Sequence, residues 1–380
     1  MDLIRLGDIA TYINGYAFKP KDWREKGIPI IRIQNLNDPN KEYNYFDGEI
    51  DSKYLVNEGD ILISWSASIG VYEWRGQQGV LNQHIFKVDF NKIKIDKKYF
   101  KYVVSIALNR ALQYMHGSTM KHITKQYFDN ILIPVPLFDQ QIKIANILDQ
   151  AQELIDKRKA QIEALDKLIQ SVFYDMFGDP GLNSKGWETG RISDIIVKTQ
   201  YGTSTKANET EGEYAVLRMN NITYSGNWDF KSLKYVDLDE KDRKKYLVYK
   251  GEVLFNRTNS KELVGKTAVY KREEPMAYAG YLVKATPNNR ANGQFIASYM
   301  NTKYTKSLLF NMAKNIVGMA NINAEEFKNI KVYIPPIEIQ NQFAEIVESI
   351  EKQKELLNES LVELENNFNS LVQRAFKGEL

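Results

Sequence analysis

The 380-residue sequence contains no cysteine and only three histidines, at positions 84, 116 and 122. Without cysteine there are no disulfides and no thiolate chemistry, and a zinc site has almost no ligands available. No apolar run approaches the 18 residues of a membrane-spanning helix, and the opening MDLIRLGDIA is not typical of a signal peptide. We therefore expect a cytoplasmic protein that binds no metal.

Sequence patterns for catalysis are also scarce. The stretch SKELVGKT (260–267) ends like a phosphate-binding loop, but Ser260 replaces the first glycine, so we predict a surface hairpin there. No Asn-Pro-Pro-aromatic stretch is present, of the kind with which amino-methyltransferases hold a flipped adenine. The chain therefore lacks this motif for chemistry on a flipped base. We predict that the protein is not an enzyme and binds no cofactor itself.

The net charge of +3 hides an alternation along the chain. Residues 1–136 carry +3, residues 137–185 carry −2, residues 186–335 carry +7 and residues 336–380 carry −5. Basic segments can attract phosphate, whereas acidic segments do not lie on it. So small a total charge predicts that the chain alone binds any polyanion only weakly and in a salt-sensitive way.

The chain is an internal repeat. MKHITKQYFDNILIPVP (120–136) returns as MANINAEEFKNIKVYIP (319–335), at a separation of 199. Earlier, RLGDI returns as RISDI and IIRIQNL as VLRMNNI at a separation of 186, and GDILIS returns as GEVLFN at 192. The growing separation indicates duplication followed by insertions in loops. Short apolar runs between turn residues predict β structure in each copy, followed by one helical stretch, at 96–115 and at 292–313.

A second pattern follows each copy. Apolar residues step by 4 and 3 from Ile144 to Met176, and each has its counterpart 199 residues later, from Phe343 to Ala375. This spacing is typical of a coiled-coil seam, and a helix of that length spans about 50 Å. Arg158 and Lys354 interrupt the two series, so we expect them to lie at the edge of the seam or to fix its register.

These patterns predict an α+β fold with a pseudo-twofold internal repeat. Two mixed α/β domains are separated by two long helices that pack as an antiparallel coiled coil. The expected boundaries are 1–136 for the first domain, 137–178 for the central helix, 179–335 for the second domain and 336–380 for the C-terminal helix.

Three stretches carry a resemblance to a known family: GSTMKHITKQYFDNILIPVPLFDQQIKIANIL (117–148), MFGDPGLNSKGWE (176–188) and NINAEEFKNIKVYIPPIEIQNQFAEIV (321–347). With the opening IRLGDIATYINGYAF and the EGDILIS stretch, the chain resembles the specificity (S) subunit of Type I restriction–modification enzymes over essentially its whole length. One departure is that the second copy reads NIVGMANIN where the first reads HGSTMKHIT, so contacts made by those side chains are not carried across.

The resemblance implies a division of labour. The two domains would be target-recognition domains, each reading half of a bipartite site in double-stranded DNA. The helices would be spacers that fix the distance between half-sites and dock two modification (M) subunits. Those partners would bind S-adenosylmethionine and methylate adenine, and restriction (R) subunits that cleave DNA can belong to the same complex.

Polar residues at strand ends and in loops are the candidates for reading bases, because their side chains match the groups exposed in the major groove. In the first copy the candidates are Arg32, Gln34, Asn35, Ser64, Trp65, Ser66, Ser118, Thr119, Lys121 and His122. In the second copy they are Arg218, Asn220, Asn221, Asn256, Arg257, Thr258, Asn259, Ser260 and Lys261. The sequence alone leaves several alternatives open. The matched pair Arg32 and Arg218 could be structural or contact phosphate, the pair Asn35 and Asn221 could cap turns, and Trp65 could belong to the core.

Two other functions are compatible with parts of the pattern. The first is a coiled-coil scaffold with two protein-binding modules, which the charge alternation and polar loops disfavour. The second is a nuclease, which the lack of acidic clusters disfavours. Binding of genomic DNA fragments by the chain together with its M subunit would separate these functions.

Overall fold

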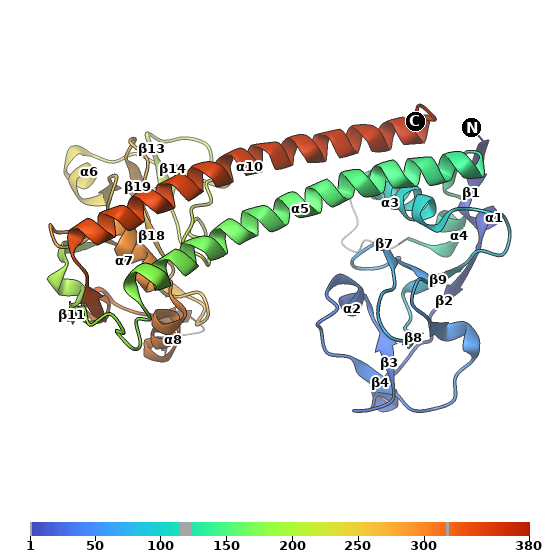
Figure 1. Ribbon diagram of the computed structural model, residues 1–380, viewed down its shortest axis with the longest axis horizontal. Coiled ribbons are helices and arrows are strands. Elements are labelled where there is room, and N and C mark those ends of the chain that lie inside the picture. Colours follow the sequence, from blue (N-terminus) through green and yellow to red (C-terminus); the bar gives the residue numbers. More distant parts are fainter. Residues whose placement is uncertain (1, 115–122, 317–318) are drawn as a thin grey trace. The chain divides into compact units, whose positions relative to one another are not determined.

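The computed structural model describes residues 2–114, 123–316 and 319–380 (Figure 1). Its internal contacts define two compact units. Unit 1 comprises Met1–Arg158 and Ser360–Leu380, and unit 2 comprises Lys159–Glu359. Each long helix begins in one unit and ends in the other, so these units divide the chain differently from the boundaries expected from the sequence. In the described residues no helix combines the length and the apolar character needed to cross a bilayer.

Unit 1 contains a two-stranded ribbon and two four-stranded sheets. The ribbon pairs β1 with β10, the first sheet has the order β2-β9-β6-β7, and the second has the order β4-β3-β8-β5. The strands are β1 (Asp2–Arg5), β2 (Thr11–Asn14), β3 (Ile28–Ile31), β4 (Asn44–Phe46), β5 (Leu55–Val56), β6 (Ile61–Ser64), β7 (Gly70–Glu73), β8 (Gly79–Leu81), β9 (Ile85–Asp89) and β10 (Leu132–Val135). The helices confined to this unit are α1 (Leu6–Ile9), α2 (Ile33–Asn37), α3 (Lys97–Tyr114) and α4 (Lys125–Asp129).

Unit 2 repeats this organisation. The ribbon pairs β11 with β23, the first sheet has the order β12-β20-β16-β18, and the second has the order β14-β13-β19-β15. The strands are β11 (Glu188–Arg191), β12 (Ile196–Tyr201), β13 (Tyr214–Leu217), β14 (Lys234–Val236), β15 (Leu247–Val248), β16 (Val253–Asn256), β18 (Thr267–Val269), β19 (Met276–Tyr278), β20 (Leu282–Pro287) and β23 (Lys331–Ile334). The helices confined to it are α6 (Glu240–Tyr246), α7 (Gly293–Met300), α8 (Lys303–Met312) and α9 (Ala324–Lys328).

The two units match strand for strand. In each, the second sheet contains one parallel pair, β3 with β8 and β13 with β19, among antiparallel neighbours. The predicted α+β class and internal repeat are therefore confirmed. Unit 2 adds a small sheet, β17-β22-β21, that the sequence did not predict, formed by β17 (Thr258–Asn259), β21 (Lys314–Ile316) and β22 (Met319–Asn321).

The second predicted helical stretch is broken into two helices. α7 ends at Met300, and α8 begins at Lys303 after Thr302, whose side-chain oxygen accepts a hydrogen bond from the Thr305 amide at 3.3 Å. An N-cap of this kind stabilises the start of a new helix. The Asn301 side chain meanwhile donates to the Thr267 carbonyl at 2.6 Å, which fixes the break to the neighbouring strand. The stretch 292–313 is therefore helical as predicted, but it forms two helices rather than one.

A buried glutamine performs the same task in both units. Gln141, in the first turn of α5 (Phe138–Phe177), donates to the Pro136 carbonyl at 2.8 Å and accepts from the Asp96 amide at 2.9 Å. Gln340, in the first turn of α10 (Ile337–Lys377), donates to the Pro335 carbonyl at 2.7 Å and accepts from the Asn292 amide at 2.9 Å. Each glutamine therefore joins the start of a long helix to the start of the helix that covers the sheet.

The two long helices share the core of each unit in opposite directions. In unit 1 the first half of α5 packs with the last part of α10, as Leu148 and Val372 show by lying in one apolar cluster. In unit 2 the last part of α5 packs with the first half of α10, through Phe173 and Phe343 at a centroid distance of 5.6 Å. Within each unit the helices therefore run antiparallel, as predicted. The supercoiling of a coiled coil remains a prediction.

Lys354 contacts the other long helix, and its role in fixing the register stays a prediction. Its ammonium pairs with the Asp166 carboxylate of α5, and its side chain is largely buried. Because Asp166 is partly exposed, the pair costs less desolvation than a fully buried one, and it favours this axial alignment of the two helices.

The hydrogen bonds of the buried glutamine Gln340 generate a stability prediction. Replacing Gln340 with Leu leaves the Asn292 amide and the Pro335 carbonyl without partners in a buried place. We expect a loss of about 1–3 kcal/mol in the free energy of unfolding of unit 2. The control is Gln342→Leu, at an exposed position two residues along the same helix, with an expected change within about 0.5 kcal/mol. Denaturant unfolding of both variants measures the difference, and equal midpoints would contradict the role given to Gln340.

Candidate nucleic-acid interface

The turns that follow β3 and β13 are built alike and each contains a buried asparagine. Asn35 accepts from the Arg32 amide at 3.2 Å and donates to the Lys41 carbonyl at 3.2 Å. Asn221 accepts from the Arg218 amide at 2.9 Å, and both asparagines are only 1% exposed. The turn-capping alternative left open by the sequence is the one seen, and neither asparagine is accessible to a duplex in this structure.

The arginines of these turns are half-buried and bonded within the protein. Arg32 donates to the Asn44 side chain at 2.9 Å and lies over the Trp23 ring at 5.3 Å. Arg218 donates to the Ser232 carbonyl at 2.6 Å. Their matched positions therefore reflect a shared structural task, since each guanidinium connects its turn to the segment that follows. Of the candidates in these two turns, Gln34 and Asn220 are the ones exposed.

Ser64 and Asn256 end the matched strands β6 and β16 and are both fully buried. Ser64 donates its hydroxyl proton to the Ser68 carbonyl. The side-chain amide of Asn256 finds no partner within the described part of the chain. Different chemistry at this matched pair was predicted to distinguish two half-sites, but burial gives neither side chain direct access to a base. Ser66, two residues after Ser64, is by contrast half-buried.

Trp65 and Arg257 come next along the chain and occupy equivalent places. The Trp65 carbonyl accepts from the Ile123 amide at 3.1 Å, and the Arg257 carbonyl accepts from the Ile322 amide at 2.9 Å. Both side chains are half-buried. Ser118, Thr119, Lys121 and His122 precede Ile123 and lie outside the described residues.

The polar run 256–261 was the strongest candidate in the second copy, and it is only partly a loop. Thr258 and Asn259 form β17, which pairs with β22, and Thr258 is buried. Ser260 is exposed, and Lys261 lies with its ammonium over the Phe310 ring at 4.5 Å. The predicted hairpin is present, closed by the Asn256 amide bonding to the Lys266 carbonyl at 2.8 Å, although its return strand is buried rather than on the surface.

Two lysines that the sequence did not single out fix the turn after β13. Lys266, 7% exposed, donates to the Met219 carbonyl at 2.7 Å and to the Ile222 carbonyl at 2.5 Å, and burial lowers its pKa. Lys306 donates to the Tyr224 carbonyl. Burial first, and then the charge of Lys266, lowers the pKa of Lys306 to about 8. Two desolvated cations thus stabilise the backbone of a turn that presents Asn220 and Tyr224 to solvent.

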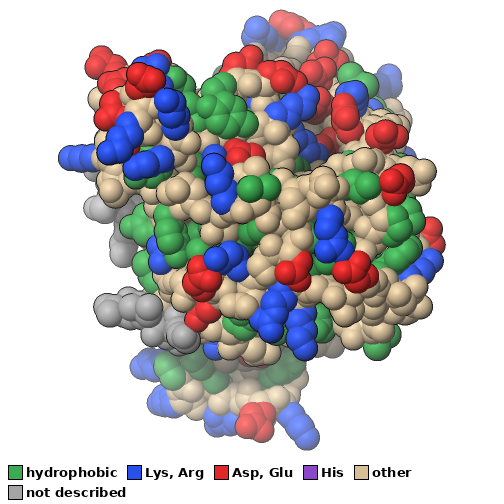
Figure 2. Space-filling view, turned by 90° about the vertical axis from the view of Figure 1, so that its left-hand side faces the viewer, with side chains coloured by type: hydrophobic (Ala, Val, Ile, Leu, Met, Phe, Trp, Pro, Cys, Tyr) green, Lys and Arg blue, Asp and Glu red, His purple; other side chains and the backbone are tan. Residues whose placement is uncertain are grey.

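Charge on the surface is mixed. The face of unit 2 nearest the viewer in Figure 2 carries Lys and Arg side chains interspersed with Asp and Glu. The excess positive charge of residues 186–335 is therefore not gathered into one field on this face. Among the described residues, no group of three or more His, Asp or Glu side chains is arranged to hold a metal ion.

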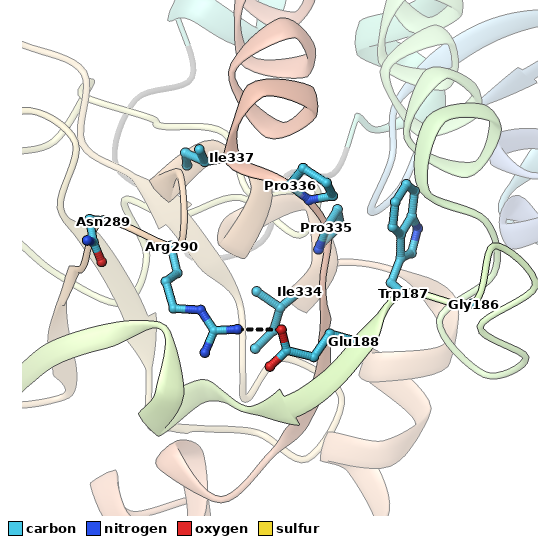
Figure 3. A pocket seen from close by; sticks show the side chains of 9 residues that line it. All are labelled: Gly186, Trp187, Glu188, Asn289, Arg290, Ile334, Pro335, Pro336 and Ile337. Atoms are coloured by element: carbon cyan, nitrogen blue, oxygen red, sulfur yellow. Dashed lines mark hydrogen bonds and ion pairs between the residues drawn. The ribbon is translucent and has the colours of Figure 1, made fainter.

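A shallow cleft of about 450 Å³ lies elsewhere in unit 2 (Figure 3). Glu188 and Arg290 form an ion pair across it at 2.7 Å, beside Pro335 and Pro336 at the entry to α10. None of the candidate base-reading residues lines this cleft. The cleft lies where the β11–β23 ribbon meets the start of α10, and it is separate from the candidate interface.

A comparison with protein families matches both copies of the repeat to one family, and this chain belongs to it. The family model described as Type I restriction modification DNA specificity domain matches residues 1–164 and 184–366, so the chain is a specificity subunit that carries the domain twice. A non-catalytic role in DNA sequence recognition goes with that membership.

Individual relatives agree with this assignment. The EcoBI specificity subunit of Escherichia coli is 23% identical and the EcoKI specificity subunit of E. coli K12 is 24% identical. The alignments cover 99% and 98% of this chain and 85% and 87% of those proteins. Among solved structures, the S subunit from M. genitalium has a TM-score of 0.56 at 15% identity, covering 99% of this chain and 96% of that one. A chain from a study of assembly and conformational transition in the type I R-M system has a TM-score of 0.61 at 15% identity, covering 100% and 98%.

Several residues of the candidate interface were not found from the sequence. Lys266 and Lys306 are examples, as are Asn14 and Tyr201, which end the matched strands β2 and β12. A signal for the last two was available. Gly15 and Gly202 follow them, and a Cβ there would come within 2.0 Å and 2.3 Å of a backbone oxygen. Because only glycine tolerates so close an approach of another backbone, the two glycines mark equivalent positions in the two copies and so identify the residues before them.

The lysine pair predicts a local effect. Replacing Lys266 with Met keeps the length of the side chain but removes both bonds to the turn. We expect faster hydrogen exchange in residues 218–229 while global stability changes little, because a buried cation is removed together with its bonds. Lys250→Met is the matched control, since Lys250 is exposed and its ammonium pairs with the carboxylate of the exposed Glu273. Unchanged protection of the turn in the Lys266 variant would contradict the role described.

Proposed function

We infer that each unit reads one half of a bipartite site in double-stranded DNA. The observation that carries this proposal is the combination of identical strand order with different side chains at matched sheet ends, such as Trp65 and Arg257. One scaffold positions both sets, so the two half-sites would be unlike in sequence. Side chains at strand ends suit this task because a rigid sheet fixes where they point.

The long helices would set the distance between half-sites. Each helix contributes to the core of both units, and each is continuous over about forty residues: 40 in α5 and 41 in α10. A continuous helix transmits a fixed rise of about 1.5 Å per residue. The spacing between the half-sites would therefore follow from helix length.

The chain would act with partners that carry the chemistry. We propose that two copies of a modification subunit, which binds S-adenosylmethionine and methylates adenine, dock on the long helices, and that restriction subunits can join them. Matched exposed apolar residues support two equivalent docking places. Ile147 on α5 is 38% exposed, and Ile346, at the equivalent place on α10, is 39% exposed. The chain would thus be the non-catalytic specificity component of a DNA adenine methyltransferase or of a Type I restriction endonuclease.

The helix-length proposal can be tested by insertion. Seven residues of helix would be added to both α5 and α10, after Arg158 and after Glu359, where the units meet in sequence. The insertion adds about 10 Å of helix, so the unspecified spacer should lengthen by about 3 base pairs. Sequencing of methylated sites in a host that also expresses the modification subunit gives the answer.

The matched control places seven residues in the exposed loop at 209–212, which leaves both helices and the candidate base-reading residues unchanged and should leave the spacer unchanged. An unaltered spacer in the helix variant, with methylation retained, would rule out this role for the helices.

The half-site proposal predicts a one-sided effect of Arg257→Ala. Removal of the guanidinium should cost about 1–3 kcal/mol of discrimination at one base of the second half-site, because a side-chain contact to a base edge is worth that much. The first half-site should be read as before. An unchanged methylation pattern would remove Arg257 from the interface.

A further inference from the structure

Three positions at the ends of the first sheet match between the units and differ in every side chain. They are the last residue of β2 or β12, the residue after β6 or β16, and the residue before β9 or β20. The first triplet is Asn14, Trp65 and His84, and the second triplet is Tyr201, Arg257 and Tyr281.

Backbone hydrogen bonds establish the correspondence. The Trp65 amide donates to the His84 carbonyl at 3.2 Å, and the Arg257 amide donates to the Tyr281 carbonyl at 3.0 Å. The strand registers agree as well, since Asn14 opposes Phe86 as Tyr201 opposes Val283. The two triplets therefore have the same backbone and different chemistry.

Within each triplet the residue from β2 or β12 contacts the residue after β6 or β16. In unit 1 the Trp65 indole donates to the side-chain oxygen Oδ1 of Asn14 at 3.2 Å, and its ring centroid lies 4.8 Å from that of His84. In unit 2 the Arg257 guanidinium lies over the Tyr201 ring at 4.9 Å. The aromatic side chain of the contact follows β6 in unit 1, whereas in unit 2 it ends β12. The polar side chain takes the other position in each unit, and the contact between the two positions is retained.

The guanidinium of Arg257 retains capacity for a further ligand. Of its five N–H donors, one reaches the Gly280 carbonyl and one reaches the Asn321 side chain, both at 3.4 Å, near the long limit of a hydrogen bond. Such bonds are weaker than the charge-assisted pair that a guanidinium makes with the O6 and N7 acceptors of guanine. Tyr201 is 41% exposed, so the pair lies at the surface of the sheet end.

We propose that Tyr201 is a positioning residue for Arg257, and that this pair reads a guanine in the second half-site. In unit 1, Asn14 is likewise the positioning residue for Trp65, which contacts the first half-site. The ring of Tyr201 restricts the plane of the guanidinium and so its hydrogen-bonding directions. The inference rests on the proposed function, because it assumes that unit 2 contacts base edges.

A graded series at Tyr201 tests the pairing. Tyr201→Phe keeps the ring and loses only the hydroxyl that accepts from the Ala324 amide at 3.0 Å, so the guanine preference should remain. Tyr201→Leu removes the ring face, and discrimination for guanine at one position of the second half-site should fall about 2- to 30-fold. The full chain with its modification subunit is used, and binding to duplexes that carry each of the four bases at that position is measured in competition.

Two further variants separate positioning from a general loss of structure. Adding Tyr201→Leu to Arg257→Ala should cause no further loss of discrimination, because the ring acts only through the guanidinium. Asn14→Leu, the matched control, should alter the first half-site alone. Equal weakening at both half-sites by Tyr201→Leu, additive losses in the double variant, or an unchanged guanine preference would each overturn the pairing.

The outcome also distinguishes this inference from the proposed function. If the unaltered chain with its partner methylates no two-part sequence, the proposed function fails. If the unaltered chain methylates such a sequence and the Tyr201→Leu variant keeps its guanine preference in the second half-site, only the role of Tyr201 in positioning Arg257 fails.

Discussion

The burial of the apolar faces of α5 and α10 is the constraint on which the rest of the structure depends. Neither helix face can remain in water, and each is covered within a unit by the other helix and by the sheet. Leu148 and Val372 share a cluster with Tyr12 of β2 and Phe86 of β9 in unit 1. Phe173 and Phe343 share one with Phe255 of β16 in unit 2. Because helix and sheet have one core, the residues at the sheet ends are anchored to the helices.

The duplication divides the chain into positions that are the same in both copies and positions that differ. Gln141 and Gln340 make the same bonds, and the ammonium groups of the half-buried Lys87 and the buried Lys284 donate to the matched Leu55 and Leu247 carbonyls. These groups stabilise the scaffold, since each satisfies a buried backbone oxygen. The two triplets differ instead, and they lie where one edge of the sheet is accessible. A scaffold used twice with different surface chemistry is what recognition of two unlike sequences requires.

Much of the architecture was predictable because periodicity and repetition are properties of the sequence itself. The steps of 4 and 3 identified both long helices, and the constant separation of 199 identified the second copy of the ribbon strand and the helix. The break between α7 and α8 was missed because the Thr302 cap and the Asn301 bond outweigh helix propensity there. The β17-β22-β21 sheet was missed because its strands are only two or three residues long.

The candidate interface was less predictable, for a different reason. A polar residue at a strand end can face solvent or cap a turn, and composition does not distinguish the two. Asn35 and Asn221 proved to be caps, and Ser64 is buried against its own loop. The partners Asn14 and Tyr201 lie about fifty residues from the side chains they contact, so only strand pairing brings them together. Register, rather than residue type, identifies them.

Methylated-base sequencing of DNA from a host that carries this chain with its modification subunit tests the central claim most directly. Two sheets with different triplets on one repeated scaffold predict a sequence of two unlike halves separated by a spacer of constant length. A palindromic sequence, or one continuous sequence without a spacer, would contradict the account.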